Sequence, residues 1–344
     1  STVPHDDRWH LPYPSPERLA RWLAEGGELR LRGDERRLAM ARRAADEWGE
    51  ACEQAGDPEP ERLAQALATA RGEIGLVTSR GRVLKLSVLD LPAIPSSAND
   101  PNLQGGVPLS EVLSLETGER ALALTSLPAD GPGLVLGTRQ GVVKRVNPEV
   151  LSRDEWEVIA LKDGDEVVGA LDLCTGDETL CFISSDAQLL HFGADGVRPQ
   201  GRSGGGIAGI RLTAGEQVAW FGALDRTAVD SPEGAVVVTA SGSSTALPGT
   251  EPGAVKVAPF SEYPAKGRAT GGVRCHRFLK GEDALVFAWA GAAPARAAAS
   301  SGAPIDLPAA TGRRDGSGVP GSQAIAACAA PVGPRLDPAP PVQG

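Results

Sequence analysis

Cationic side chains gather in one glycine-rich stretch of the chain, residues 197–212, with the sequence VRPQGRSGGGIAGIRL. It holds three arginines and five glycines and no acidic residue. Guanidinium groups bind phosphate oxygens through paired hydrogen bonds, and glycine lets a backbone approach a ligand closely. The stretch therefore predicts phosphate binding, in a chain whose formal net charge is -10.

The same element recurs along the chain. The copies are PNLQGGVPL (101–109), RPQGRSGGGIAGIRL (198–212), YPAKGRATGGVRCHRFL (263–279) and TGRRDGSGVPG (311–321). Their shared core is Gly-Arg, two residues, then Gly-Gly and an aliphatic residue, which puts Arg202 and Arg268 in the same place. On one rim of a disc, such loops make a broken basic track that suits a phosphate backbone. The alternative interpretation, equally favoured by the repeat, is that the glycines serve turns between repeats and the arginines are solvated surface residues.

Charge is unevenly distributed. Residues 1–72 carry net -3, residues 73–190 net -9 and residues 191–344 net +2, and within the last part residues 197–280 carry net +4. The acidic residues are densest in 149–178, where the Gly-Arg element is absent. The sequence predicts a basic arc beside an acidic one.

Other chemistry finds little support. The five cysteines never form a C-x-x-C pair, which favours free thiols in a reducing cytoplasm over disulfides or a zinc site. The four histidines form no catalytic or metal-binding pattern, although His276 lies among arginines, where a phosphate contact is open to it. No Gly-x-x-x-x-Gly-Lys-Ser/Thr loop for ATP and no acidic cluster for magnesium is present. We expect no catalytic residues, no metal and no cofactor in this chain.

The elements that must position these loops fall into three zones. Residues 1–70 are predicted to be a helical or linker segment, 71–330 a strand-rich domain, and 331–344 a disordered Pro-rich tail. No apolar run is long enough to span a membrane and no signal peptide is readable.

The strand-rich domain repeats as β-hairpins. We predict them at 76–86, 136–146, 182–192 and 237–247, with turns centred near Gly81, Gly141, Asp186 and Gly242, and a fifth, worn copy at 285–297. Repeats at intervals of roughly 50 residues indicate a solenoid or a propeller.

Hairpins of the G-x-V-K-R type joined to these Gly-Arg segments resemble the C-terminal domain of bacterial type IIA topoisomerase A subunits, those of DNA gyrase and topoisomerase IV. The likeness covers roughly residues 70–330, and GRATGGVRCHRFLKGEDALVFAWAG (267–291) resembles the actinobacterial topoisomerase IV type. The resemblance implies a mainly β fold, a propeller-like β-pinwheel of five or six blades. It also implies a basic outer rim that bends double-stranded DNA and presents it to a catalytic core.

The departures from that family narrow the prediction. The nearest match to the gyrase Gln-Arg-Arg-Gly-Gly-Lys-Gly box is Gln104-Gly105-Gly106, which lacks the basic residues, and this favours topoisomerase IV over gyrase. Neither Tyr13 nor Tyr263 follows an arginine as the family's catalytic tyrosine does. The resemblance therefore predicts a non-catalytic, cytoplasmic and nucleoid-associated domain whose protein partners are the A-subunit catalytic core and the ATPase (the B subunit). ATP and magnesium are needed only by the complete enzyme.

Sequence-nonspecific DNA binding is the predicted function. The alternative is a protein-interaction propeller that binds a basic partner through its acidic face, 149–178. The predicted DNA-binding residues are Arg198, Arg202, Arg211, Lys266, Arg268, Arg274, Arg277 and Lys280, with Lys144, Arg145, Lys85 and Arg82 adding to the rim.

Overall fold

The computed structural model describes residues 72–91, 109–127, 130–246, 252–300 and 303–330. These ranges are built mainly of short β-strands, with two short α-helices, α3 (Leu109–Val112) and α4 (Arg226–Asp230). No described helix is long and apolar enough to cross a membrane. The expected helical segment 1–70 and the Pro-rich tail 331–344 lie outside the described residues.

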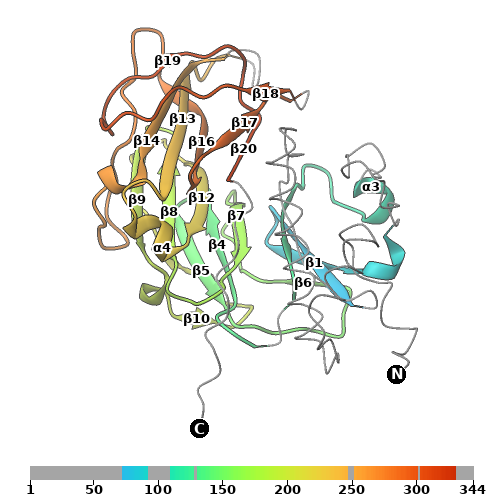
Figure 1. Cartoon of the computed structure of the whole chain (residues 1–344). Helices are drawn as coiled ribbons and strands as arrows, with labels where there is room; N and C mark the ends of the chain where they lie inside the picture. The colour runs from blue at the N-terminus through green and yellow to red at the C-terminus, as the bar shows by residue number, and fades with distance from the viewer. Residues whose placement is uncertain (1–71, 92–108, 128–129, 247–251, 301–302, 331–344) are drawn as a thin grey trace, which may run out of the picture.

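The strands form five sheets, which we call blades 1 to 5 (Figure 1). Blade 1 has the order β3 (Ala121–Thr125), β1 (Glu73–Thr78), β2 (Arg82–Ser87), β6 (Glu155–Glu157). Blade 2 runs β7 (Val167–Asp172), β4 (Leu134–Thr138), β5 (Val142–Val146), and β5 then pairs with both β10 (Pro199–Gln200) and β11 (Ile207–Ala208). Blade 3 runs β12 (Val218–Leu224), β8 (Thr179–Ser184), β9 (Gln188–Gly193), β15 (Val273–Arg274). Blade 4 runs β16 (Ala284–Ala292), β13 (Ala235–Gly242), β14 (Ala254–Pro259), β19 (Val319–Pro320), and blade 5 runs β18 (Pro304–Ile305), β17 (Arg296–Ala298), β20 (Ala327–Ala329). The expected mainly β, propeller-like fold is confirmed, with five blades in the described residues.

Antiparallel hairpins form the middle of blades 1 to 4. The predicted hairpins 76–86, 136–146 and 182–192 are β1–β2, β4–β5 and β8–β9. Gly81 and Gly141 have the positive φ that their turns require, at 72° and 83°. In the third turn Ala187, at 59°, adopts this conformation.

The other two hairpin predictions were wrong in detail. Gly242 is the last residue of β13, so the return strand of that hairpin is β14, beyond 247. Residues 285–297 are not a hairpin, because β16 pairs with β13 in blade 4 while β17 belongs to blade 5. Both segments contain the apolar run of a buried strand, and such a run does not say which strand is the partner.

In blades 1 to 4 the outer strand is supplied by the chain after it has entered the next blade. β6 completes blade 1 but follows the β4–β5 hairpin of blade 2 in sequence. In the same way β11 follows β8–β9, β15 follows β13–β14, and β19 follows β17–β18. Neighbouring blades are therefore linked through exchanged strands as well as through packing.

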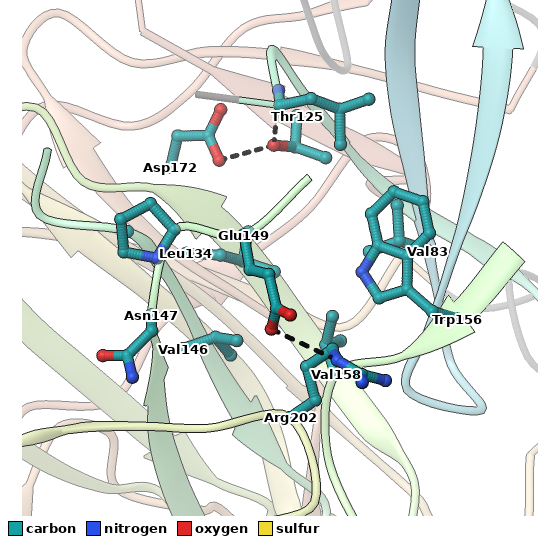
Figure 2. A pocket seen from close by; sticks show the side chains of 13 residues that line it. Val83, Thr125, Leu134, Val146, Asn147, Glu149, Trp156, Val158, Asp172 and Arg202 are labelled. Atoms are coloured by element: carbon teal, nitrogen blue, oxygen red, sulfur yellow. Dashed lines mark hydrogen bonds and ion pairs between the residues drawn. The ribbon is translucent and has the colours of Figure 1, made fainter. Parts of the chain in front are cut away.

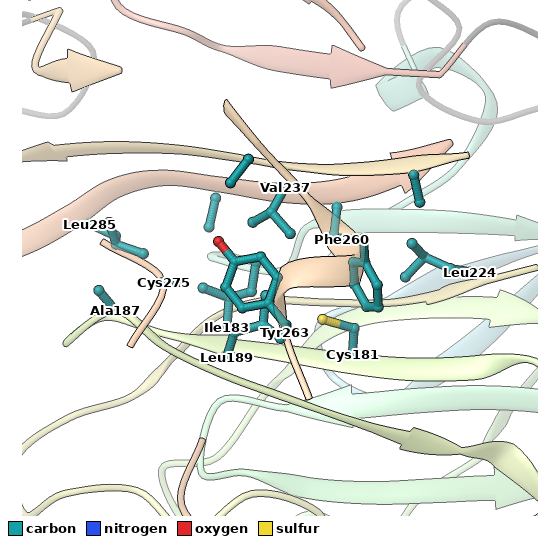
Figure 3. Close-up of a cluster of buried hydrophobic side chains, with 14 residues drawn as sticks. Cys181, Ile183, Ala187, Leu189, Leu224, Val237, Phe260, Tyr263, Cys275 and Leu285 are labelled. Atoms are coloured by element: carbon teal, nitrogen blue, oxygen red, sulfur yellow. The ribbon is translucent and has the colours of Figure 1, made fainter. Parts of the chain in front are cut away.

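The opposite edges of the blades meet each other. β3 contacts β7, β7 contacts β12, and β12 contacts β16. Apolar cores fill the spaces between consecutive blades. Figure 3 shows the core between blades 3 and 4, to which Cys181, Ile183 and Leu189 contribute from one blade and Val237, Phe260 and Leu285 from the other. Since the contacting strands lie inside, the exchanged strands β6, β11, β15 and β19 lie at the far edge of their sheets.

Tyr263 in this core carries a buried hydroxyl with no hydrogen-bond partner among the described residues. Burial raises the pKa of this hydroxyl well above its usual value. An unpaired buried hydroxyl costs about 1 kcal/mol or more of folding free energy. We expect Tyr263→Phe to increase the free energy of unfolding by about 1 kcal/mol, measured by urea denaturation. A loss of stability would show that the hydroxyl has a partner.

Candidate nucleic-acid interface

Gly-Arg loops lead into the outer strands of three blades. The loops are residues 201–206, 267–272 and 312–318, and they precede β11, β15 and β19. Blade 1 differs, because its outer strand β6 follows the sequence EVLSRD (149–154). The repeated element seen in the sequence is thus the entry to an exchanged strand, which places it at the outer edge of the molecule.

The last glycine of each loop lies almost in contact with the second strand of its blade. A Cβ atom on Gly206 would come within 2.8 Å of the carbonyl oxygen of Val143, and one on Gly272 within 2.6 Å of that of Leu189. A Cβ atom on Gly318 would come within 2.6 Å of the carbonyl oxygen of Ala254. Any side chain there would push the loop off the blade, so packing explains this part of the Gly-Gly-aliphatic pattern.

Backbone hydrogen bonds join the loops of successive blades. Arg211 N–H donates to the carbonyl of Thr270 at 3.0 Å, and Ala269 N–H donates to the carbonyl of Gly209 at 2.5 Å. Further along, Arg277 N–H donates to the carbonyl of Gly316 at 3.0 Å. Residues 198–212, 263–280 and 311–321 therefore form one continuous surface, which we call the rim strip.

Eight of the predicted DNA-binding residues lie on the rim strip. Seven of them are exposed, and they are Arg198, Arg211, Lys266, Arg268, Arg274, Arg277 and Lys280. Arg268 is held against the preceding loop, where its Nη1 donates to the carbonyl of Ala208 at 3.2 Å. The structure thus brings these seven cations together on one surface, as the repeat predicts.

Arg202 is the half-buried member of the set. Its Nε lies 3.2 Å from Glu149 Oε2, at a pocket between blades 1 and 2 that is also lined by Trp156 and Asp172 (Figure 2). The guanidinium remains 34% exposed, so it is reachable from solvent. A phosphate at this place must compete with Glu149.

Lys144 does not lie on the open rim, and its placement there was wrong. Its side chain is fully buried, and its Nζ donates to the carbonyls of Arg202 and Gly204 at 2.8 and 2.7 Å. The neighbouring Arg145 is half-buried and donates from Nε to the carbonyl of Pro132 at 2.6 Å. The Gly-Arg loop covers this part of β5, which is why a strand lysine there is inside the molecule.

The two cations predicted on blade 1 are engaged in ion pairs. Lys85 Nζ lies 3.0 Å from Glu73, and Arg82 Nη2 lies 2.5 Å from the buried carboxylate of Glu119. Their side chains are only 11% and 16% exposed. Burial alone would raise the pKa of Glu119, but the hydrogen bonds from Arg82 and Thr78 outweigh it and lower this pKa to about 2. On blade 1, Lys85 and Arg82 therefore stabilise the fold through ion pairs.

Several acidic side chains of 149–178 are likewise used inside the molecule. Glu178 is buried and accepts from the backbone N–H groups of Cys174, Thr175 and Gly176. Asp172 accepts from Thr125 and Ser126 of blade 1, and Glu166 pairs with Arg120 and Arg139. Asp154, Glu157, Asp163 and Asp177 remain exposed, and so do Glu149 and Glu155, which pair with Arg202 and Arg82. The acidic face is therefore weaker than its composition suggests.

His276 is a core residue and is not available to phosphate. Its side chain is buried, Gly318 N–H donates to Nε2 at 3.2 Å, and Nδ1 lies 2.8 Å from Thr239 Oγ1. Because Nε2 must accept, the proton resides on Nδ1 and the ring is neutral. Burial, reinforced by the nearby Lys256 ammonium, lowers the pKa of His276 to about 4.

Arg313 and Arg314 belong to the rim strip but were not among the predicted site residues. Arg313 is exposed and Arg314 is half-buried. The signal that could have found them is the Gly-Arg pair at 312–313, which the copy at 311–321 already displays.

Several known proteins are similar to this chain in sequence. Residues 178–224 and 249–288 match the family model of the DNA gyrase C-terminal domain, a β-propeller. The DNA gyrase A subunit of Staphylococcus epidermidis is 30% identical over 203 residues, and that of Escherichia coli is 29% identical over 212, which are 57% and 60% of this chain. The chain spans only about a fifth of these curated relatives, 20% and 22% of their lengths.

Two solved structures have the same fold. The C-terminal domain of a DNA topoisomerase IV aligns with a TM-score of 0.60 at 18% identity, over 82% of this chain and 87% of that one. The DNA gyrase A C-terminal domain aligns with a TM-score of 0.52 at 16% identity, over 76% of this chain and 83% of that one. The resemblance drawn from the sequence motifs is confirmed at the level of this family.

Proposed function

We propose that this chain, a relative of the C-terminal domains of type IIA topoisomerase A subunits, binds double-stranded DNA along its rim strip without sequence preference. One observation carries the proposal: seven exposed cations lie on a continuous outer surface formed by three hydrogen-bonded Gly-Arg loops. Phosphates need positive charge at intervals, and the exposed Lys and Arg of the rim strip supply it without base readout.

The DNA path covers part of the disc only. The basic residues of the rim strip lie on blades 2, 3 and 4, while the corresponding edge of blade 1 begins with Glu149 and presents Asp154 and Glu157. Like charges near a phosphate backbone repel it. Bending by this domain is accordingly modest and of the topoisomerase IV type, with little wrapping of the gyrase type.

In the complete enzyme this domain presents DNA to the A-subunit catalytic core, which works with the ATPase (the B subunit). The chain itself neither cleaves nor relaxes DNA, and ATP and magnesium serve the complete enzyme in the bacterial cytoplasm, at the nucleoid. The alternative, a propeller that binds a basic protein through 149–178, has less support because Asp172, Glu166 and Glu178 bind partners within the chain.

The test is DNA binding as a function of salt. For the purified chain and duplexes of unrelated sequence, we expect log K to fall linearly with log salt, with a slope of about -0.9 for each phosphate contacted. The rim strip predicts similar slopes for all sequences. A flat salt dependence, or binding confined to one sequence, would refute the proposal.

A further inference from the structure

Two buried lysines hold Gly-Arg loops from beneath. Lys144 in β5 donates from Nζ to the carbonyls of Arg202 and Gly204, at 2.8 and 2.7 Å. Lys256 in β14 donates to the carbonyls of Cys275 at 2.5 Å, Arg313 at 3.3 Å, and Arg314. Each ammonium thus binds the backbone of an arginine on the rim strip.

The two lysines occupy the same place in two blades. In blade 2, Val143 pairs with Ile207, the first residue of the outer strand, and Lys144 follows Val143. In blade 4, Val255 pairs with Val319, the first residue of that outer strand, and Lys256 follows Val255. The arrangement is therefore a repeated device of the fold.

In blade 3 a different group donates hydrogen bonds to the carbonyls of the Gly-Arg loop. The equivalent residue there is Leu190, which follows Leu189, the partner of Val273. The carbonyls of Gly271 and Gly272 instead take long bonds of 3.4 Å from Lys266, a lysine of the loop segment itself. Leu190 is as buried as the lysines, so the position tolerates an apolar side chain.

A glycine-rich loop that turns carbonyls toward a blade needs donors there, because water cannot reach them. An ammonium group offers three donors at one point, enough for the two or three carbonyls found around each lysine. The exposed fractions of Lys144 and Lys256 are 0% and 3%, which leaves neither group a surface for DNA. Burial lowers the pKa of both amines to about 8, so both are still mainly charged at neutral pH.

We propose that Lys144 and Lys256 are positioning residues of the rim strip: each fixes the backbone of a Gly-Arg loop so that its arginines face outward, and neither contacts DNA. This rests on the proposed DNA binding. On this proposal, the lysines of the chain have two different roles. Exposed lysines bind phosphate, and the buried Lys144 and Lys256 position the arginines that do so.

A double-mutant cycle with Lys144→Met and Arg202→Ala tests the proposal. If Lys144 acts through Arg202, each single change lowers DNA affinity by about tenfold and the salt slope by about one, and the double change does no more than either. If Lys144 contacted a phosphate, the losses would add and the slope would fall by about two, which would overturn the proposal. Leu190→Met, at the same place in blade 3, is the matched control and should bind like the wild type.

Two measurements separate this proposal from the proposed function. Amide hydrogen exchange in 201–206 should accelerate in Lys144→Met and not in Leu190→Met, whether or not DNA is present; unchanged exchange would overturn the holding role. Acylation of lysines in the wild-type chain needs no variant. Lys144 and Lys256 should react slowly with and without DNA, while Lys266 and Lys280 should react fast and become protected by DNA. Protection of Lys144 by DNA would overturn the proposal, and protection of no lysine would refute DNA binding and with it the positioning role.

Discussion

Replacing Arg202 and Arg268 together with glutamate is expected to weaken binding to every duplex alike, by roughly 100-fold at low salt, with a salt slope smaller by about two. The two arginines hold the same place in successive Gly-Arg loops, and the loops are joined through Ala269 N–H and the carbonyl of Gly209. Reversing these two charges therefore removes two neighbouring phosphate contacts and places a carboxylate that repels phosphate at each position. The measurement is a titration of fluorescent duplexes of unrelated sequence at several salt concentrations.

The matched control reverses the same number of charges away from the rim strip. Arg153→Glu with Arg226→Glu changes two exposed arginines outside it and leaves the net charge equal to that of the test variant. This control should bind nearly as the wild type does. Equal losses in both double variants would mean that DNA senses only the total charge, and a loss limited to one duplex would indicate base recognition.

Acidification from pH 6.5 to pH 4 is expected to cost about 3 kcal/mol of folding free energy through His276 alone. Its pKa in the folded chain is about 4, below the ordinary value of 6.5. Between these two values the unfolded chain binds a proton that the folded chain does not, so stability falls as the pH falls. The physical cause is burial of the ring, reinforced by the nearby Lys256 ammonium. In addition, Gly318 N–H points at Nε2, so a second ring proton would find no acceptor there.

Comparison with His276→Asn isolates this effect from the titrating carboxylates. The variant is expected to be less stable at pH 7, because Gly318 N–H loses its acceptor, and the difference from wild type should shrink by about 3 kcal/mol at pH 4. Urea denaturation at a series of pH values gives both curves. A gap that stays constant with pH would show that the imidazole titrates normally in the folded chain.

The fold was predictable where local chemistry decides it. The hairpins around Gly81 and Gly141 combine short apolar strands with a glycine in a turn of positive φ, and both are found where the sequence places them. The exchanged strands were not predictable, because β11, β15 and β19 are two residues long and a hairpin of the next blade separates each of them from its partner in the sequence. So short a segment has no periodicity to read, and only tertiary packing selects its neighbour.

The site was predictable for side chains whose surroundings are local. Arg268 and Arg313 of the Gly-Arg loops lie outside, and Arg202 and Arg314 are half-buried, because the glycines beside them lie against the blade. Lys144 and Arg82 could not be placed from the sequence, since their exposure depends on Gly204 and Glu119, which are distant along the chain. A lysine in a strand is usually solvated. Lys144 is buried because the carbonyls of a loop folded over it accept its hydrogen bonds.

Because strands are exchanged between blades, a whole repeat can be lost from such a protein without leaving an incomplete sheet. A deletion that runs from a point in one hairpin to the same point in the next, for example from β9 to β14, removes the end of one sheet and the start of another together. It also removes β11, the outer strand of blade 2, and β15 is then free to take that place. The two remnants fit, because the outer strand that blade 4 receives then completes the joined sheet. The repeating structural unit is thus half of one blade and half of the next, and the number of such units can change while no sheet is left with a missing edge.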